Sequence, residues 1–261
     1  EAQLAAMLEG DRAGFGALEA LTLTGDQAGR ARDVWLQRTV SGASERLAQV
    51  RERVLAAAHL PRHGLALDLN AASGLLTWEA LRRVAEGGVW SLAANSAEAA
   101  ALREIADRLP ELERPVVLQG RVEELPDLLA LRGESDVRFD AIVGRGAFSP
   151  SVTASRMDAI ATLARLLRPE GIVSLAEPWP RQAQRLYSLV DLSALAPALA
   201  EALQAAEEAI YADPADPLVN WDRDDLAAQL AAAGLAAVAL EPQETTSEVV
   251  ITPALLGRWF N

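Results

Sequence analysis

Short runs of apolar residues alternate with amphipathic stretches between residues 65 and 177. In the amphipathic stretches, apolar residues recur every three or four positions, which is the spacing of one helix face. The apolar runs do not alternate with polar residues, so the strands they predict are expected to be buried on both faces. This repetition predicts an α/β fold, a parallel sheet covered by helices. The predicted strands are LALDL (65–69), VWSLA (89–93), PVVLQ (115–119), FDAIVG (139–144) and GIVSLAE (171–177).

Helical patterns lie before the first predicted strand and after the last one. Residues 1–63 predict a helical N-terminal extension whose last helix ends at Pro61. After residue 177, a helical insertion over about 178–220 ends in a loop rich in Pro and Asp. We therefore divide the chain into a helical extension, residues 1–63, and an α/β domain, residues 64–261, that contains the insertion.

The end of the chain predicts two further strands. WDRDDLAAQLAAAG is an amphipathic helix that stops at Gly234. LAAVALEPQETTSEVVIT (235–252) has two apolar runs around a polar turn, which is typical of an antiparallel hairpin. With this hairpin, we expect a three-layer αβα domain whose mostly parallel sheet has about seven strands and an antiparallel terminal strand.

Composition excludes several kinds of chemistry. The chain has 261 residues and no Cys, which excludes disulfides, thiolate metal ligands and a cysteine nucleophile. All 24 basic residues are Arg, and without Lys neither a P-loop nor a lysine Schiff base can form. His59 and His63 could hold a metal, but their place favours a helix end, where the dipole suits an imidazolium. No metal site is therefore predicted.

The charge and hydropathy of the chain bear on its partners. The formal net charge is −13, which disfavours strong nucleic-acid binding by this chain alone because such binding requires neutralisation of phosphates. No apolar run reaches the roughly 18 residues of a membrane span, and the polar start has no secretory signal. We expect a cytoplasmic protein that does not enter membranes.

The order of the predicted elements resembles the class I S-adenosylmethionine-dependent methyltransferase fold, which is Rossmann-like. The resemblance covers roughly residues 64–251 and implies S-adenosylmethionine as the cofactor. The segments that carry it are LALDLNAASGLLTWEALRR as the first motif, FDAIVGRGAF as the fourth strand, LLRPEGIVSLAE as the turn into the fifth strand and AAAGLAAVAL as the helix end and sixth strand.

The resemblance places the cofactor at the turn after the first strand. In the family this turn reads acidic-x-G-x-G-x-G; here Asp68 and Gly74 are kept, whereas Asn70 and Ala72 replace two glycines. Asn tolerates a positive φ better than most residues, so we expect Asn70 to hold the turn. The Ala72 methyl group lies where the methionine part of the cofactor would approach, and it either fits or blocks the site. The implied cofactor-binding residues here are Asp68, Asn70, Ala71, Ala72, Ser73 and Gly74.

Other cofactor positions also depart from the family pattern. Asn95 stands where the family has a ribose-binding carboxylate, and Glu98 three residues later favours a capping box over a ribose contact. Arg121 stands where the family often has a carboxylate that faces the adenine, so its charge has the wrong sign. Gly144, at the end of the fourth strand, completes the implied cofactor-binding set.

Three residues near the ends of the fourth and fifth strands are candidates for substrate contact. The GRGAF segment is faintly similar to a sequence found here in some ribosomal-RNA methyltransferases, so Arg145 is a candidate anion or substrate contact, or a loop Arg that pairs with a carboxylate. Glu177 and Trp179 follow the fifth strand, at the edge of the sheet where ligands bind in open α/β folds. Trp179 either stacks on a base or ring of a ligand or packs in the core or a lid. No catalytic residue is assigned.

A second resemblance concerns the context of the chain. The lead-in GDRAGFGALEALTLTGDQAGRARDVWLQRTV and the first motif are similar to a methyltransferase-like domain fused behind an AAA+ ATPase of the replication-associated recombination type (RarA/MgsA). This resemblance implies an upstream AAA+ ATPase in the same polypeptide, as expected for a chain that does not begin with Met. No ATPase motif occurs in the chain itself.

Two hypotheses for the function follow. The altered turn favours a methyltransferase-like domain with a degenerate cofactor loop, which serves as a regulatory or interaction module of a larger DNA replication or recombination protein. The alternative is an active S-adenosylmethionine-dependent methyltransferase in which the insertion is a substrate lid. A dinucleotide oxidoreductase is disfavoured because G-x-G-x-x-G is absent. The hypotheses differ in whether Ala72 and Arg121 leave the pocket open or fill it.

Overall fold

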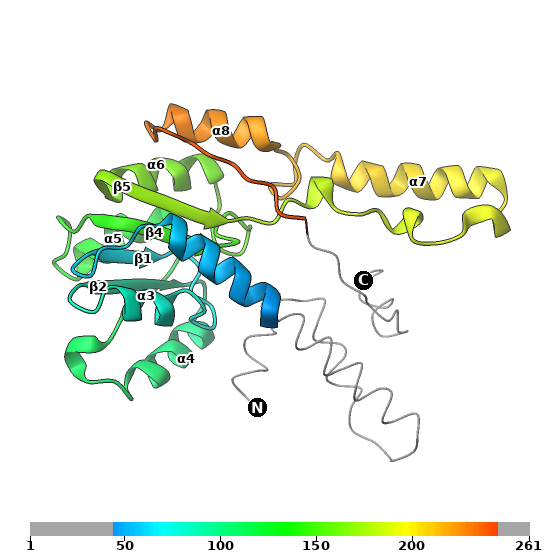
Figure 1. Ribbon diagram of the computed structural model, residues 1–261. Helices are drawn as coiled ribbons and strands as arrows, with labels where there is room; N and C mark the ends of the chain where they lie inside the picture. Colours follow the sequence, from blue (N-terminus) through cyan, green and yellow to red (C-terminus); the bar gives the residue numbers. More distant parts are fainter. Residues whose placement is uncertain (1–43, 245–261) are drawn as a thin grey trace, which may run out of the picture.

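The computed structural model describes residues 44–244, and its centre is a parallel β-sheet (Figure 1). The strands run in the order β3-β2-β1-β4-β5, and each neighbouring pair is parallel. This arrangement confirms the predicted parallel sheet. The strands are β1 (Leu65–Asp68), β2 (Gly88–Ala93), β3 (Val116–Gln119), β4 (Phe139–Arg145) and β5 (Leu167–Ala176).

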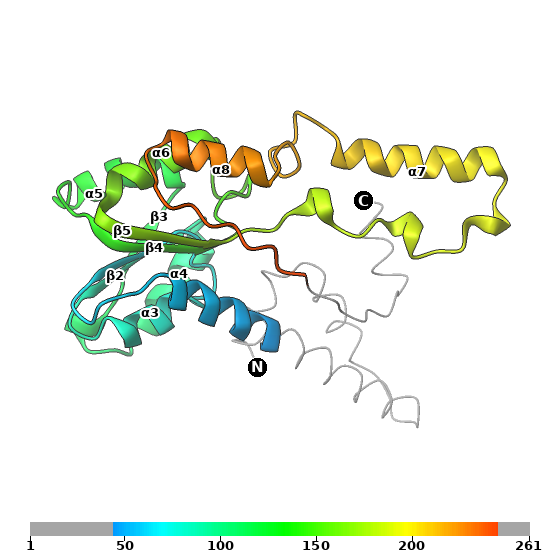
Figure 2. The same cartoon turned by 45° about the horizontal axis from the view of Figure 1, so that its top comes forward.

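Helices cover both faces of the sheet and complete a three-layer α/β arrangement (Figures 1 and 2). A helix over residues 44–57 lies with α3 and α4 on one face, and α5, α6 and α8 lie on the other. Alternate strand residues point to opposite faces: Leu67 and Ile142 pack in the α5–α6–α8 core, whereas Ala66 and Ala141 pack against the helix over residues 44–57 and α3. The helix bounds are α3 Thr77–Arg83, α4 Ser96–Ala106, α5 Leu125–Leu131, α6 Arg156–Leu166 and α8 Arg223–Ala232.

The C-terminal side of the sheet differs from the prediction. Residues 235–240, expected to form the sixth strand, are not a strand, and the left-handed backbone of Ala237 (φ 54°) interrupts the extended conformation that a strand needs. The second half of the expected hairpin lies outside the described residues. The seven-strand count and the antiparallel strand are thus not confirmed, and in the described part of the chain β5 pairs only with β4.

Residues 180–220, which we call the arm, project from the body of the domain (Figures 1 and 2). The outgoing half contains the short 3₁₀ turns η5 (Pro180–Gln182), η6 (Leu186–Ser188) and η7 (Leu192–Ala194). The returning half is the 15-residue helix α7 (Pro197–Tyr211). The predicted helical insertion is therefore an appendage with one long helix rather than a compact layer of the domain.

A pair of tryptophan rings closes the base of the arm. Trp179 and Trp221 stack with ring centroids 6.3 Å apart and planes 8° from parallel. The Arg156 guanidinium lies 5.2 Å from the centre of the Trp221 ring, and its Nη1 donates to the Pro217 carbonyl at 3.2 Å. Because Arg156 begins α6, these contacts fasten both ends of the arm to the body of the domain.

Candidate functional site

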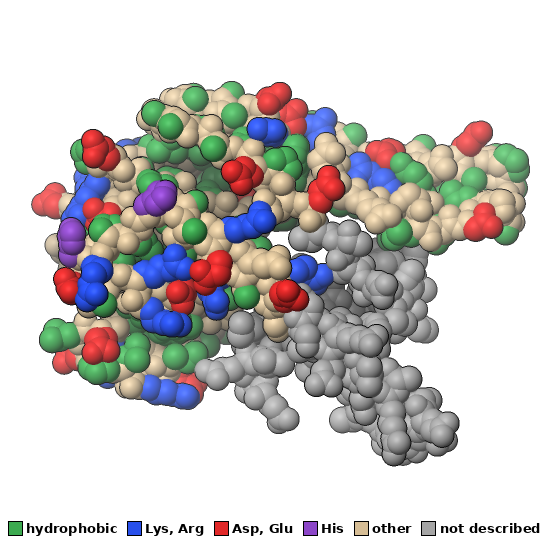
Figure 3. Space-filling model, in the orientation of Figure 1, with side chains coloured by type: hydrophobic (Ala, Val, Ile, Leu, Met, Phe, Trp, Pro, Cys, Tyr) green, Lys and Arg blue, Asp and Glu red, His purple; other side chains and the backbone are tan. Residues whose placement is uncertain are grey.

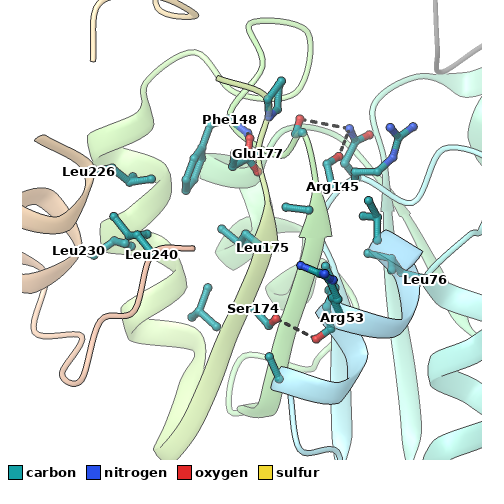
Figure 4. A pocket seen from close by; sticks show the side chains of 18 of the residues that line it. Arg53, Leu76, Arg145, Phe148, Ser174, Leu175, Glu177, Leu226, Leu230 and Leu240 are labelled. Atoms are coloured by element: carbon teal, nitrogen blue, oxygen red, sulfur yellow. Dashed lines mark hydrogen bonds between the residues drawn. The ribbon is translucent and has the colours of Figure 1, made fainter. Parts of the chain in front are cut away.

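A cavity of about 3220 Å³ opens at the carboxyl ends of the strands (Figure 4). It is lined by the turn after β1, by the segments after β2 and β4, and by β5 together with the residues that follow it. It also extends along β5 to the helix over residues 44–57. The volume exceeds the roughly 300–1,000 Å³ that is common for small-ligand sites, because the cavity runs the whole length of β5 as well as past the strand ends.

The turn after β1 is held by the side chain of Asn70. Its Nδ2 donates to the carbonyl of Arg145 at 2.9 Å and to that of Gly146 at 3.2 Å, so it ties the loops after β1 and β4 together. The left-handed residues of the turn are Ala72 (φ 41°) and Gly74 (φ 83°), so the positive φ expected at Asn70 is not there. Asn70 thus stabilises the turn through its amide, and Ala72 carries the backbone conformation that glycine would adopt without strain.

Gly74 is required by the packing of the turn. It has φ 83°, and a Cβ atom at this position would clash with the indole of Trp78. The Trp78 Nε1 donates to the Ser73 carbonyl at 3.4 Å. Ala71, Ala72 and Ser73 line the cavity beside Asn70, whereas Gly74 is buried beneath them. The role of Trp78 under the turn had no signal in the sequence.

Asp68 lies behind the turn and does not line the cavity. It is fully buried, and its Oδ2 accepts a hydrogen bond of 2.8 Å from Thr77 Oγ1. Thr77 Oγ1 also lies 2.9 Å from Ser91 Oγ on β2. Burial raises the pKa of Asp68 to about 6, and the hydrogen bonds oppose that rise. Asp68 therefore connects β1, β2 and the start of α3, and it supports the turn from below.

Asn95 caps α4 as predicted, but the reciprocal bond of a full capping box does not go to the Asn95 amide: Glu98 bonds the amide of the preceding residue, Ala94. Asn95 accepts from the Glu98 amide at 3.0 Å, and Glu98 Oε2 accepts from the Ala94 amide at 3.1 Å. The Asn95 Nδ2 donates to Glu98 Oε1 at 2.9 Å. Both side chains line the cavity. A carboxylate thus lies at the end of β2, but it comes from Glu98 in the first turn of the helix.

Arg121 and Gly144 do not line the cavity. The Arg121 guanidinium pairs with Glu124 at 3.1 Å, and its side chain is half-exposed. The nearby Glu123 accepts from the backbone amides of the loop before α6 rather than facing the cavity. Gly144 is inside β4, where a Cβ atom would be 3.2 Å from Leu69 Cβ. Neither Arg121 nor Gly144 obstructs the space at the strand ends.

Arg145, Glu177 and Trp179 all line the cavity, and their contact with a substrate stays a prediction. Glu177 accepts from the amides of Ala147 at 2.8 Å and Phe148 at 3.2 Å, in the loop after β4. Burial raises the pKa of Glu177 to about 7, although these hydrogen bonds and the charge of Arg145 act in the opposite direction. Figure 4 shows Glu177 beside Phe148, with Arg145 nearer to the turn after β1.

Two residues that the sequence did not single out also line the cavity. Arg53, on the helix over residues 44–57, points into it near Leu76 (Figure 4). Phe148 supplies an aromatic wall next to Glu177. Trp179 packs against the core, and its Nε1 is buried without a hydrogen-bond partner among residues 44–244. Trp179 thus packs on the Trp221 ring and against the core, whereas its stacking on a ligand ring stays a prediction.

No group of three or more His, Cys, Asp or Glu side chains in residues 44–244 could hold a metal ion. In the same residues, no helix is both long and apolar enough to cross a bilayer.

No protein-family model and no curated protein matches the chain. Among solved structures, the cyclopropane synthase MmaA2 from Mycobacterium tuberculosis is similar, with 20% identity over 72% of this chain and 60% of that chain and a TM-score of 0.48. The glycopeptide N-methyltransferase MtfA is 24% identical over 54% of this chain and 57% of that chain, with a TM-score of 0.39. Precorrin-6y C5,15-methyltransferase from Geobacter metallireducens is 21% identical over 49% of this chain and 60% of that chain, with a TM-score of 0.40. The chain spans less than two thirds of the length of each.

Proposed function

We propose that this chain binds S-adenosylmethionine at the carboxyl edge of its sheet and acts as a methyltransferase. The observation that carries the proposal is the cavity that the turn after β1 and the loop after β4 both line. β1 has β2 on one side and β4 on the other, so the cavity lies at the point where the strand order reverses. In open α/β sheets this is the preferred place for a nucleotide-like ligand.

The residues present fit such a cofactor. Ala71, Ala72 and Ser73 line the cavity, and neither Ala72 nor Arg121 closes it. Glu98 offers a carboxylate at the end of β2, where ribose hydroxyls need acceptors. Phe148 adds an apolar wall. We assign cofactor binding to the turn and Glu98, with Asp68 as a support of the turn.

The chemistry needs few protein groups. A bound S-adenosylmethionine supplies a methyl group on a sulfonium, and transfer depends mainly on positioning and exclusion of water. Glu177 lies in the same cavity with a pKa of about 7, so it can take up a proton that an acceptor group loses near neutral pH. Arg145 offers a positive charge for an anionic part of the acceptor.

A second candidate function is a regulatory or interaction module without cofactor. It is favoured by Ala72, whose left-handed backbone and methyl group replace a glycine, and by Asn95, whose side chain is engaged in capping α4. The upstream AAA+ ATPase and the role in DNA replication or recombination belong to this candidate, and they rest on sequence resemblance alone.

Calorimetric titration with S-adenosylmethionine and S-adenosylhomocysteine separates the two candidates. We expect a micromolar Kd, which corresponds to a binding free energy of about −8 kcal/mol. Glu98→Gln should weaken it about tenfold, because a neutral amide is a poorer acceptor for hydroxyl groups. Glu104→Gln is the matched control, since Glu104 is on the same helix in an exposed pair with Arg108, and it should bind like the wild type. If no heat of binding is detected at millimolar ligand, the methyltransferase proposal is rejected and the regulatory or interaction module without cofactor is favoured.

A further inference from the structure

Helix α7 exposes apolar side chains along its length. None of its 15 residues is buried, and Leu199, Leu203 and Ile210 are 56%, 41% and 62% exposed. Hydrophobic side chains are visible on the surface of the arm in Figure 3. An isolated helix of this length is marginal in water, and most helices gain stability by packing an apolar face. Within residues 44–244, the exposed face of α7 therefore lacks the packing that usually stabilises such a helix.

The contacts that hold α7 within the arm are polar and lie on another side of the helix. Glu207 accepts from the amides of Leu186 at 2.6 Å and Tyr187 at 3.0 Å. Glu208 pairs with Arg185 at 3.0 Å and accepts from the Tyr187 hydroxyl at 2.7 Å. These bonds fix the orientation of the helix against the outgoing half of the arm, and they leave the apolar residues facing outward.

The apolar residues of α7 form a self-complementary seam. Leu199, Leu203, Ala206 and Ile210 are spaced by four, three and four residues, so they fall on one stripe of the helix. If a second α7 lies antiparallel about the midpoint between residues 204 and 205, Leu199 meets Ile210 and Leu203 meets Ala206. Each seam residue then has a seam residue as its partner, as a two-fold interface requires.

We propose that α7 pairs antiparallel with α7 of a second copy of this chain. The neighbouring stripe of the helix is all alanine, so a second helix can approach without meeting a charge; these residues are Ala198, Ala202, Ala205 and Ala209. The charged residues of α7 are all Glu, which disfavours nucleic acid and anionic membranes as occupants. The seam itself carries no charge that two copies would bring together.

The shape of the molecule permits this pairing. The arm projects from the body, so an antiparallel pair places the two bodies at opposite ends of the paired helices (Figures 1 and 2). A 15-residue helix spans about 22 Å, which exceeds the Debye length of roughly 8 Å at physiological salt. The repulsion between two bodies of like charge is therefore largely screened.

The extent of the surface indicates a weak pair. A stable interface buries roughly 800 Å² per partner, and α7 alone offers only about two heptads. The arm adds three exposed apolar residues from its outgoing half, Leu189, Val190 and Leu195. We therefore expect an association that depends on concentration and dissociates on dilution.

Sedimentation velocity of the 261-residue chain, from about 1 to 200 µM, tests the pair through its mass-action shift. The wild type should shift from monomer to dimer across this range, and Leu203→Glu should remain a monomer throughout. Leu112→Glu is the matched control, because Leu112 is 99% exposed outside the arm, and it should dimerise like the wild type. Circular dichroism of each variant checks that the fold is retained. A wild type that stays monomeric, or a dimer unaffected by Leu203→Glu, overturns the proposal.

The orientation of the pair has its own test. Because the chain has no Cys, single cysteines are unique. A mixture of Leu203→Cys and Ala206→Cys chains should form the mixed disulfide under mild oxidation about tenfold more than either homodisulfide, since these positions face each other across the antiparallel seam. Preferential homodisulfides would indicate a parallel pair and contradict the proposed geometry.

Discussion

Ala72 carries a backbone conformation that side chains rarely adopt. Its φ of 41° is in the left-handed region, which costs a non-glycine residue roughly 1–2 kcal/mol. The turn nevertheless forms, because Asn70 fastens it to the loop after β4 and the Trp78 indole packs beneath Gly74. The strain at Ala72 is therefore offset by its neighbours rather than relieved.

Replacement of Ala72 by Gly should stabilise the protein. Gly adopts the left-handed region freely but has more freedom in the unfolded chain, so we expect a net gain of about 0.5–1 kcal/mol in the free energy of unfolding. Urea denaturation measures this gain. Ala71→Gly is the control, because Ala71 is buried without a positive φ, and it should destabilise the protein. A loss of stability in Ala72→Gly would show that the methyl group contributes more by packing than it costs in strain.

Glu177 should make stability depend on pH. Its pKa is about 7 in the folded chain, above the ordinary 4.5. A raised pKa means that folding disfavours the ionised form, so this contribution to stability is complete below pH 4.5 and is lost as the pH rises through 7. We expect the wild type to lose on the order of 2 kcal/mol relative to Glu177→Gln between pH 5 and 8. Parallel stability curves for the two proteins, measured in urea, would contradict this expectation.

Some residue roles could be predicted from the sequence and others could not. The capping role of Asn95 follows from local spacing, since Glu98 is three residues away. The contact of Asp68 through Thr77 to Ser91 depends on the register that pairs Asp68 with Ser91 across β1 and β2. The left-handed residue was assigned to Asn70 because the prediction weighed residue type alone. The left-handed conformation is at Ala72 instead, and its position in the turn depends on which side chain can reach the loop after β4.

Among the elements, the strands of the parallel sheet were the most predictable. Strands buried on both faces produce continuous apolar runs, and all five runs became strands. The run over residues 235–240 has the same composition, but Ala237 adopts a left-handed conformation and the segment does not join the sheet. Local sequence cannot reveal this difference, because pairing with β5 decides whether such a run becomes a strand.

The attachment of the arm depends on Trp221. This residue is 6% exposed and stacks on Trp179 beneath the Arg156 guanidinium. Trp221→Ala should therefore cost about 3–5 kcal/mol of stability and increase the rate at which a protease cuts the arm. Trp221→Phe keeps a stacking ring and should lose much less. Urea denaturation and limited proteolysis measure the two effects, and unchanged cleavage in Trp221→Ala would mean that other contacts hold the arm.

At the scale of the whole molecule, a bound cofactor should stabilise the folded chain. A ligand that binds only the folded state adds about 2.7 kcal/mol at one hundred times its Kd. For a chain of this size, that gain raises Tm by roughly 5–10 °C. Thermal denaturation with millimolar S-adenosylhomocysteine checks the shift, with adenosine as a control for the missing amino-acid part. An unchanged Tm would favour the module without cofactor.

The stacked pair at the base of the arm has a consequence for how this protein can vary. Trp179 and Trp221 bring the two ends of a long excursion within one ring stack of each other. A short turn between them would close the chain and leave the strands of the sheet in their register. The segment between Trp179 and Trp221 can therefore be replaced by an insertion of different length or sequence without a change in the sheet. The arm, which we propose associates with a second copy, can then change in evolution independently of the residues at the strand ends.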